Sequence, residues 1–444
     1  MAAILSERTG QGMILIQNCR LVDPASGTDA RRDILTEGGR IRQIAEPGTV
    51  SVYGLGKGDL KIDADGLIAV PGLVDTHVHF RDPGALYKED ILTGARAAAA
   101  GGVTSVVLMA NTSPPVDNPE TLAYVLRKGE QTGIRVHSCA NVTAGMAGKA
   151  LTDMEALRRC GAAGFTDDGK PVLDRELACR AMEEAARLGV PISFHEEDPA
   201  FIRNNGIHAG RASAHFGIGG SDRQAEIVMV RRDLELALKT GASIVIQHIS
   251  AAESVELVRQ AKKKGGNIHA EATPHHFSMT QEDAIRYGTL AKMNPPLREE
   301  ADRLAILEGL RDGTIDIIAT DHAPHAAEEK ALPIEKAPSG IIGLETSLAL
   351  GLMYLVKPGY LTLSGLIRCM SENPAKLYGL DAGYLAAGGP ADLTLFDETK
   401  SWTPTRFFSK SQNSPFLHRT LCGKVKYTIC QGQVVYEDGK KALF

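Results

Sequence analysis

The chain has 444 residues and a formal net charge of −5, a length that allows a large hydrophobic core and more than one domain. No block of basic residues stands out, which argues against a nucleic-acid-binding protein, and no apolar run is long enough to span a membrane. The seven cysteines have no repeated spacing, which favours a reduced, cytoplasmic protein over a disulfide framework.

The first part of the chain, residues 13–66, has the pattern of short strands separated by turns. The strand patterns cover Met13–Leu21, Gly39–Ile44 and Lys61–Asp63. Residues 1–12 precede these patterns and lack the charged-then-apolar order of a signal peptide. Because a strand-like run begins at Met13, we predict that residues 1–12 are either a disordered extension or the result of a mis-assigned start.

Residues 67–379 alternate between apolar strands and amphipathic helices. The strands are apolar on both faces, as expected for parallel strands covered by helices on each side. The eight predicted strands are Ile68–Asp75, Thr104–Ala110, Arg135–Ala140, Ala163–Thr166, Pro191–Phe194, Ser243–Gln247, Asn267–Ala272 and Ile315–Thr320. Helical patterns cover Thr121–Gly133, Asp174–Gly189, Asp222–Gly241 and Glu253–Gly265. This alternation predicts an α/β fold with a (β/α)8 TIM barrel over residues 67–379.

The last part of the chain, residues 380–444, returns to strand patterns. Residues 390–398 and 423–438 are strand-like, and Gln431-Gly432 is suited to a hairpin turn. The simplest arrangement is a small β-sandwich domain built from residues 13–66 and 380–444. The barrel is then inserted between the two halves of this domain.

Five of the predicted barrel strands end in residues of the types that bind divalent metals. These residues are His77, His79, Asp168, His195, His248 and Asp321. His77 and His79 are two residues apart, so both project to the same side of their strand. Four imidazoles and two carboxylates suit two Zn²⁺ ions, because a carboxylate can bridge two ions. Arg81 is next on that side, and its planar guanidinium suits an anionic substrate group.

A structural role is the simpler interpretation for any one of these histidines, because a histidine at a strand end is more often a hydrogen-bonded core residue. Six metal-type residues at matching strand ends rarely arise by chance, so the set favours a metal centre. The histidines interpreted as structural are His137 in the barrel packing and His208, His215, His269 and His418 on the surface, in loops or in the core. His275 and His276 follow a strand end and a proline, and neither is assigned as a ligand.

The motifs at these strand ends resemble those of the bacterial type I dihydroorotases, within the amidohydrolase superfamily. The resemblance covers nearly all of the chain from Met13. The motifs are residues 75–84 (DTHVHFRDPG), 109–113 (MANTS), 165–169 (FTDDG), 292–298 (KMNPPLR) and 319–325 (ATDHAPH). The motif at residues 319–325, followed by Lys330, is specific for dihydroorotases. The motif at residues 75–84 is specific only for the superfamily.

The resemblance implies a site with two zinc ions and a small cyclic amide as its substrate. It implies that His77, His79 and Asp321 bind one zinc, that His195 and His248 bind the other, and that Asp168 lies between them. It also implies substrate contacts from Arg81, Asn111, Asn294 and His325, with the backbone at Gly340 beside the substrate ring. Asp321 is expected to act as the catalytic acid and base. The implied reaction is the reversible cyclisation of N-carbamoyl-L-aspartate to L-dihydroorotate, a step of pyrimidine biosynthesis.

Two positions differ from many relatives. Many superfamily members bridge the metals with a carboxylated lysine near the end of the fourth strand, where this chain has Thr166-Asp167-Asp168-Gly169. This sequence fits the type I pattern and counts against hydantoinase and dihydropyrimidinase. Ser339 stands before Gly340, where relatives often have a bulkier residue, and the difference affects only the shape of the pocket.

Two other functions stay open. The chain could be another cyclic amidohydrolase, such as an allantoinase or hydantoinase, although Arg81 and the motif around His325 argue against this. It could also be an inactive dihydroorotase-like scaffold for aspartate transcarbamoylase, but such chains lose metal ligands and this one keeps every candidate. The expected partners are the small-molecule substrate and a second copy of the chain in a homodimer, with aspartate transcarbamoylase as a further candidate.

Overall fold

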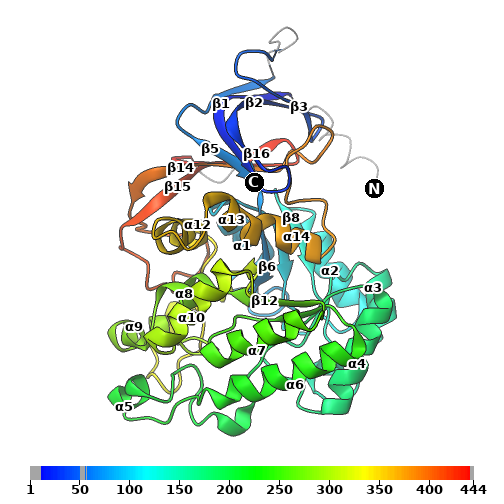
Figure 1. Cartoon of the computed structure of the whole chain (residues 1–444), viewed down its shortest axis with the longest axis vertical. Helices are drawn as coiled ribbons and strands as arrows, with labels where there is room; N and C mark the ends of the chain where they lie inside the picture. The colour runs from blue at the N-terminus through cyan, green and yellow to red at the C-terminus, as the bar shows by residue number, and fades with distance from the viewer. Residues whose placement is uncertain (1–11, 51–55, 57, 441–444) are drawn as a thin grey trace.

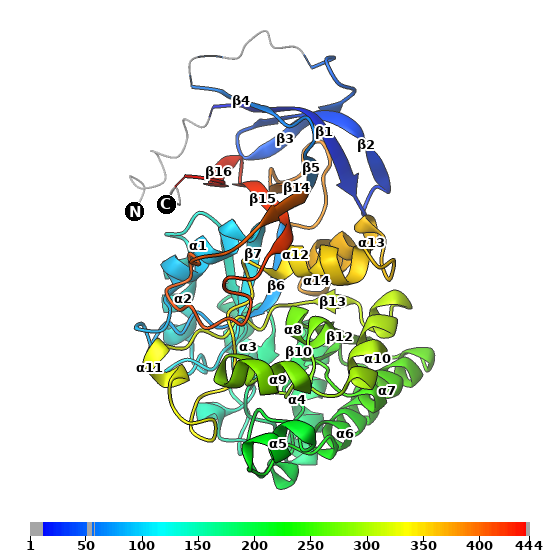
Figure 2. The same cartoon turned by 90° about the vertical axis from the view of Figure 1, so that its left-hand side faces the viewer.

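A computed structural model describes residues 12–50, 56 and 58–440. A sheet formed by both ends of the chain lies at one end of the molecule, and a barrel surrounded by helices makes up the rest (Figures 1 and 2). Residues 1–11 fall outside the described part of the chain, so the extension over residues 1–12 stays a prediction.

Eight parallel strands form the barrel. They are β6 (Leu73–Val78), β7 (Val103–Leu108), β8 (Arg135–Ser138), β9 (Phe165–Thr166), β10 (Ile192–Phe194), β11 (Ile244–Ile246), β12 (Ile268–Ala272) and β13 (Ile317–Ile318). Strands β6–β7–β8 and β9–β10–β11–β12–β13 pair in two sets. Parallel bridges between Ala140 and Phe165 and between Val78 and His322 join these sets and close the barrel. The predicted (β/α)8 barrel is confirmed.

Helices surround the barrel strands. The α-helices are α1 (Ile91–Ala100), α2 (Pro119–Gly129), α3 (Met154–Arg159), α4 (Arg175–Leu188), α5 (Arg211–Phe216), α6 (Gln224–Thr240), α7 (Ala252–Lys263), α8 (Pro274–Ser278), α9 (Gln281–Tyr287), α10 (Glu300–Arg311), α11 (Ala327–Lys330), α12 (Ser347–Gly351), α13 (Leu363–Ile367) and α14 (Asn373–Leu377). Shorter 3₁₀ or π-helical turns are η1 (Ala144–Met146), η2 (Pro199–Phe201), η3 (Gly288–Ala291), η4 (Leu352–Val356) and η5 (Arg368–Glu372).

The helix ends follow local capping rules. Asp174 accepts a hydrogen bond from the Leu177 N–H at the start of α4, and Gly189 ends α4 with φ of 65°. The four helices predicted from the sequence are confirmed, although α2 ends at Gly129 rather than Gly133. In the described part of the chain, no helix combines the length and hydropathy that a membrane crossing needs.

Strands from both ends of the chain form the terminal sheet. They are β1 (Ile14–Asp23), β2 (Thr28–Glu37), β3 (Arg40–Ala45), β4 (Leu60–Asp63), β5 (Ile68–Pro71), β14 (Leu393–Trp402), β15 (Leu421–Cys430) and β16 (Gln433–Glu437). The strand order is β16-β15-β14-β5-β1-β2-β3, and β4 pairs with β1. Ile41 of β3 and Ile429 of β15 share one apolar cluster, so the sheet folds over onto itself. The domain expected from both termini is therefore present, and one continuous hydrogen-bonded sheet supplies both of its layers.

Gly72 marks the passage from this sheet into the barrel. The single strand predicted over Ile68–Asp75 is wrong, because β5 pairs with β14 and β6 pairs with β7. The Gly72 N–H donates to the Asp392 carbonyl oxygen, and a side chain at Gly72 would meet the buried Thr104. The sheet therefore extends to Pro71, beyond the predicted boundary between residues 66 and 67. The predicted boundary at residues 379–380 falls between α14 and β14.

Gly72→Ala should lower the stability of the chain, because the new Cβ would lie 2.1 Å from Thr104 Oγ1 and 2.8 Å from Thr104 Cβ. Overpacking of this kind costs about 1–3 kcal/mol, measurable as a lower midpoint of urea denaturation. Adding Thr104→Ala should restore part of the loss. Gly58→Ala is the control, because a Cβ there meets nothing within 4 Å. An unchanged midpoint for Gly72→Ala would show that the junction tolerates a side chain.

Candidate metal centre and active site

The metal-type residues predicted from the sequence gather at the C-terminal end of the barrel, around a pocket of about 200 Å³. The pocket is lined by His79, Arg81, Asn111, Asp168, Gly169, His195, His248, Asn294, Asp321, Ala323, His325, Ser339 and Gly340. His77 does not line the pocket and is buried beside the residues that do. The barrel thus brings together side chains that come from six separate strand ends and two longer loops.

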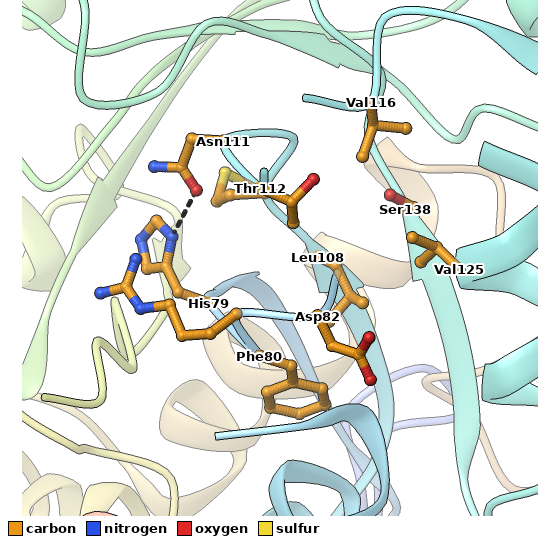
Figure 3. Close-up of a pocket in the computed structure, with 11 residues that line it drawn as sticks. His79, Phe80, Asp82, Leu108, Asn111, Thr112, Val116, Val125 and Ser138 are labelled. Carbon is orange, nitrogen blue, oxygen red and sulfur yellow. Dashed lines mark hydrogen bonds between the residues drawn. The ribbon is translucent and has the colours of Figure 1, made fainter. Parts of the chain in front are cut away.

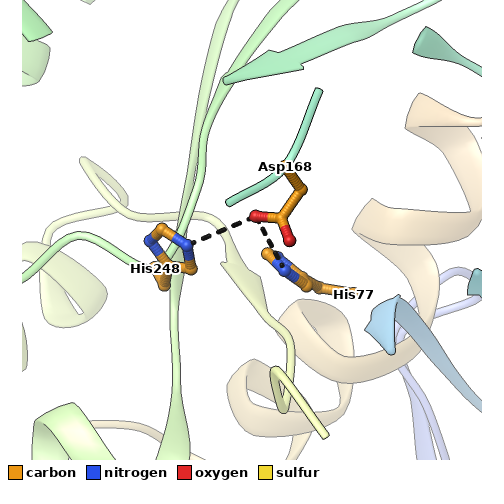
Figure 4. A group of neighbouring side chains, drawn as sticks. All are labelled: His77, Asp168 and His248. Atoms are coloured by element: carbon orange, nitrogen blue, oxygen red, sulfur yellow. Dashed lines mark ion pairs between the residues drawn. The ribbon is translucent and has the colours of Figure 1, made fainter. Parts of the chain in front are cut away.

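The carboxylate of Asp168 lies at the centre of this group. Its Oδ1 is 3.5 Å from His77 Nε2 and 3.7 Å from both His195 Nδ1 and His248 Nε2. Its Oδ2 is 3.5 Å from His79 Nε2. Figure 4 shows Asp168 between His77 and His248, which come from different strands. One carboxylate therefore faces four imidazoles, the arrangement expected of a group shared between two ions.

The second carboxylate, Asp321, lies on the side of His77 and His79. Its Oδ1 is 2.9 Å from His79 Nε2 and 3.6 Å from His77 Nε2. Among the described residues, two groups have ligand atoms within 4.8 Å of one another: His77, Asp168 and His248, and His77, His79 and Asp321. Burial alone would raise the pKa of Asp321, but the hydrogen bond with His79 and the charge of His77 hold that pKa below its ordinary value.

The residues fit a divalent metal. His77 Nε2 and Asp168 Oδ1 are buried and have no hydrogen-bond partner in the part of the chain that the structure describes, which is unusual for polar atoms inside a protein. Asp168 Oδ1 is 3.5 Å from His77 Nε2 and 3.7 Å from His248 Nε2. These distances are too long for hydrogen bonds, but they suit ligand atoms that face the same ion. Imidazole nitrogens and carboxylate oxygens are the donors that catalytic zinc sites use. The site is therefore a candidate metal centre.

A second set of contacts orients the histidines. Glu271 on β12 accepts a hydrogen bond from Thr76 Oγ1 at 3.2 Å and lies 3.0 Å from His77 Nδ1. Because the carboxylate places the ring proton of His77 on Nδ1, it leaves Nε2 free to face an ion. Asn111 Oδ1 plays the same part for His79 Nδ1, also at 3.0 Å (Figure 3).

Asn111 also donates from Nδ2 to the backbone oxygen and to Oδ2 of Asp168, both at 3.2 Å. Its side chain thus orients one histidine and one carboxylate of the centre. His195 is held from its far side, since its Nε2 is 3.2 Å from Glu197 Oε2. This contact leaves His195 Nδ1 to face Asp168, so His195 and His77 present different ring nitrogens.

The backbone is strained at three residues of the site. Arg81, His248 and Asp321 have φ of 58°, 32° and 48°, in the left-handed region that non-glycine residues seldom adopt. Each such conformation costs of order 1 kcal/mol or more and persists only where the surrounding structure enforces it. Outliers of this kind cluster at functional sites, which is consistent with the pocket being the active site.

The pocket is also lined by four residues that do not belong to the metal-type set, Arg81, Asn294, His325 and Gly340. Arg81 is half-buried, and its Nε donates to the Pro324 carbonyl oxygen at 3.3 Å. His325 Nε2 donates to the Ser339 carbonyl oxygen at 2.8 Å. Burial and the neighbouring cations, Arg81 first, lower the pKa of His325 to about 2, so its ring is neutral at pH 7.

Two features of this lining suit a bound molecule. Asn294 Oδ1 is buried and has no hydrogen-bond partner among the described residues. Gly340 has φ of 120°, and a Cβ there would lie 2.7 Å from Ala323 Cβ and 3.3 Å from His325 Nε2. Only glycine therefore leaves this wall of the pocket open.

Sequence reasoning missed Glu271 and Asn413. Glu271 carried a signal, because it is the one carboxylate in the barrel strand Ile268–Ala272. Asn413 carried no signal, since it lies in a long connection between two strands of the terminal sheet. His276, which was not assigned as a ligand, is held by Thr273 and the Pro295 carbonyl oxygen and belongs to neither candidate group.

Comparison with known proteins agrees with this geometry. The model of the amidohydrolase family matches residues 68–435. A dihydroorotase of Clostridioides difficile is 52% identical over 424 residues, which cover 96% of this chain and all of that protein. A dihydroorotase of Streptococcus pneumoniae is 50% identical over 427 residues, again 96% of this chain and all of that protein. The chain belongs to the amidohydrolase family.

Solved structures show the same fold. An L-hydantoinase from Arthrobacter aurescens superposes with a TM-score of 0.87 and 27% identity, covering 97% of each chain. This protein is also called a dihydropyrimidinase. The barrel with its terminal sheet is therefore shared with a cyclic amidohydrolase, whereas the much higher sequence identity is to dihydroorotases.

Glu271→Gln should weaken metal binding by about 10–100-fold, the usual effect of changing a group that orients a ligating histidine. The amide keeps the shape of the carboxylate but loses the charge that makes His77 a better ligand. The measurement is zinc affinity by competition with a chelating dye. Asp392→Asn changes a buried carboxylate of the terminal sheet and should leave the affinity unchanged. Equal affinities for Glu271→Gln and wild type would contradict the assignment.

Proposed function

We propose that the chain is a dihydroorotase, which interconverts N-carbamoyl-L-aspartate and L-dihydroorotate in pyrimidine biosynthesis. The observation that carries the proposal is 52% identity over 96% of the chain to a dihydroorotase. The pocket chemistry supports it, because a cation, Arg81, lines the same pocket as the metal-type residues. Such a pair of features suits a cyclic amide that carries a carboxylate.

Two zinc ions are the proposed cofactors. His77, His79 and Asp321 would hold one, His195 and His248 would hold the other, and Asp168 would lie between them. The candidate groups, which share His77, support the first set and the position of Asp168. When bound, the ions would lower the pKa of a water molecule and stabilise negative charge on the ring carbonyl.

The substrate carboxylate is proposed to bind Arg81, with Asn111 and His325 beside it. Arg81 has no carboxylate partner among its hydrogen bonds in the described structure, so a substrate carboxylate would supply the missing charge. Asn294 Oδ1 would accept a hydrogen bond from the ring. The Gly340 backbone would contact the ring where a side chain would block it.

Asp321 is proposed to move the proton in ring opening. Asp321 is ionised at neutral pH, since its pKa lies below the ordinary range, and its carboxylate would accept a proton from the attacking water. It would then deliver the proton to the ring nitrogen as the carbon–nitrogen bond breaks. The reverse sequence closes the ring and releases water.

Another cyclic amidohydrolase activity is the second candidate, favoured by the structural likeness to an L-hydantoinase. Hydantoin carries no carboxylate, so Arg81 would have no partner in that reaction. An inactive scaffold is less well supported, because every metal-type residue is retained. We also propose that the chain forms a homodimer, associates with aspartate transcarbamoylase and is located in the cytoplasm.

The zinc-loaded protein should hydrolyse L-dihydroorotate at least ~10²-fold faster than hydantoin or allantoin, measured as kcat/KM. Arg81→Lys keeps the charge but loses the planar fork, so it should cost roughly 2–4 kcal/mol in kcat/KM for dihydroorotate. The same variant should change hydantoin hydrolysis little. Faster turnover of hydantoin or allantoin by wild type would reject the proposal, and equal loss on both substrates would give Arg81 another role.

Asp321→Asn should retain most of its zinc, since the amide keeps one oxygen, while kcat falls by at least ~10²-fold because the proton acceptor is gone. Zinc content and kcat are measured on the same preparation. His195→Ala, on the far side of Asp168, is the comparison and should lose mainly one zinc ion. Near-normal turnover of Asp321→Asn with both ions bound would exclude Asp321 as the proton carrier.

A further inference from the structure

The connection between β14 and β15, residues 403–420, leaves the terminal sheet and descends along the barrel (Figure 2). Its middle part is buried at Phe407, Ser409, Ser411 and Asn413. A connection of this length, without helix or strand of its own, is uncommon in a compact protein unless it has a function. Its contacts show where it is attached.

Asn413 uses every polar group of its side chain on two loops that line the pocket. Its Oδ1 accepts the His325 N–H at 3.1 Å. Its Nδ2 donates to the carbonyl oxygens of Ala323 and Gly340, both at 3.1 Å. The Asn413 backbone oxygen also accepts the Ile342 N–H at 3.1 Å. Asn413 as a whole residue is 4% exposed, so these hydrogen bonds are shielded from water.

The two loops carry the proposed substrate contacts His325 and Gly340. They already touch each other, since the Ala323 N–H donates to the Ile341 carbonyl oxygen at 2.8 Å. Asn413 adds hydrogen bonds to both loops and so holds His325 and Gly340 at a set spacing. Both residues line the pocket, whereas Asn413 does not.

Neighbouring residues hold the connection in place. Glu345 accepts the N–H groups of Phe408 and Ser409 at 3.0 and 3.1 Å. The buried Glu89 accepts the hydroxyl of Ser409, and Ser411 donates to the Lys88 carbonyl oxygen at 2.7 Å. These anchors lie just before α1 and just before α12, so two separate segments of the barrel hold the connection that carries Asn413.

We propose that Asn413 is a positioning residue that sets the substrate-carboxylate side of the pocket, acting through His325 and Gly340. The inference rests on the proposed dihydroorotase function. Asparagine suits the position because it supplies one acceptor and two donors in one plane. Aspartate lacks the donors, and alanine lacks all three groups. Within the described structure, the hydrogen bonds of Asn413 go to His325, Ala323, Gly340 and Ile342 and to none of the metal-type residues, so the chemical step should be affected less than substrate binding.

The test compares Asn413→Ala with Gln412→Ala. Gln412 is the matched control, because its side chain also makes three backbone hydrogen bonds, all within residues 407–412. Asn413→Ala should raise KM for dihydroorotate about 10-fold or more, the effect of losing one or two buried hydrogen bonds. Its kcat should stay within about threefold of wild type, and Gln412→Ala should keep both constants.

Two further measurements separate positioning from loss of structure. Zinc content should be unchanged in Asn413→Ala, and hydrogen exchange of the His325 amide should speed up. If Asn413→Ala fails to fold, the isosteric Asn413→Asp carries the test, because it keeps the acceptor but lacks both donors; it should also raise KM. An unchanged KM in the folded variant would overturn the inference. A wild type without activity on dihydroorotate would overturn the proposed function instead.

Discussion

The buried carboxylate of Asp168 is the feature on which the rest of the site depends. A charged group removed from water is costly unless opposite charge or hydrogen-bond donors surround it. Here burial alone would raise the pKa of Asp168, but His77, His195 and His248 hold that pKa well below its ordinary value. A bound cation satisfies the same need more fully. Several side chains must therefore meet at this carboxylate, and they do so because the barrel is closed.

Barrel closure explains how distant residues meet. His79 and Asp321 are 242 positions apart, yet their side chains are 2.9 Å apart. The contact exists because Val78 bridges His322, which joins the first barrel strand to the last. The left-handed backbone at Asp321 turns its side chain toward the centre at the point of closure. The strained backbone at Asp321 and the bridge between Val78 and His322 together bring Asp321 to His79. The packed barrel offsets the cost of the strain.

The terminal sheet contributes more than a covering for one end of the barrel. Its strands β14 and β15 carry the connection that reaches the pocket and presents Asn413 to His325. The same sheet includes β5, which pairs with β14 and joins the two ends of the chain beside the first barrel strand. Sheet and barrel are therefore linked at Gly72 and again at the pocket.

The sequence by itself determined the barrel, the composite terminal domain and the side chains at the strand ends. Strand and helix periodicities are local, and the ends of parallel strands meet at one edge of a barrel whatever the details of packing. Tertiary structure alone decided that Glu271 orients His77, that Asn413 holds His325, and that the strand predicted across Gly72 divides into two. The hydrogen-bond partner of His77 is 194 positions away in the sequence, and that of His325 is 88 positions away. A hydrogen bond between such residues leaves no periodic trace in the sequence, because it arises only when the packed elements bring the two groups together.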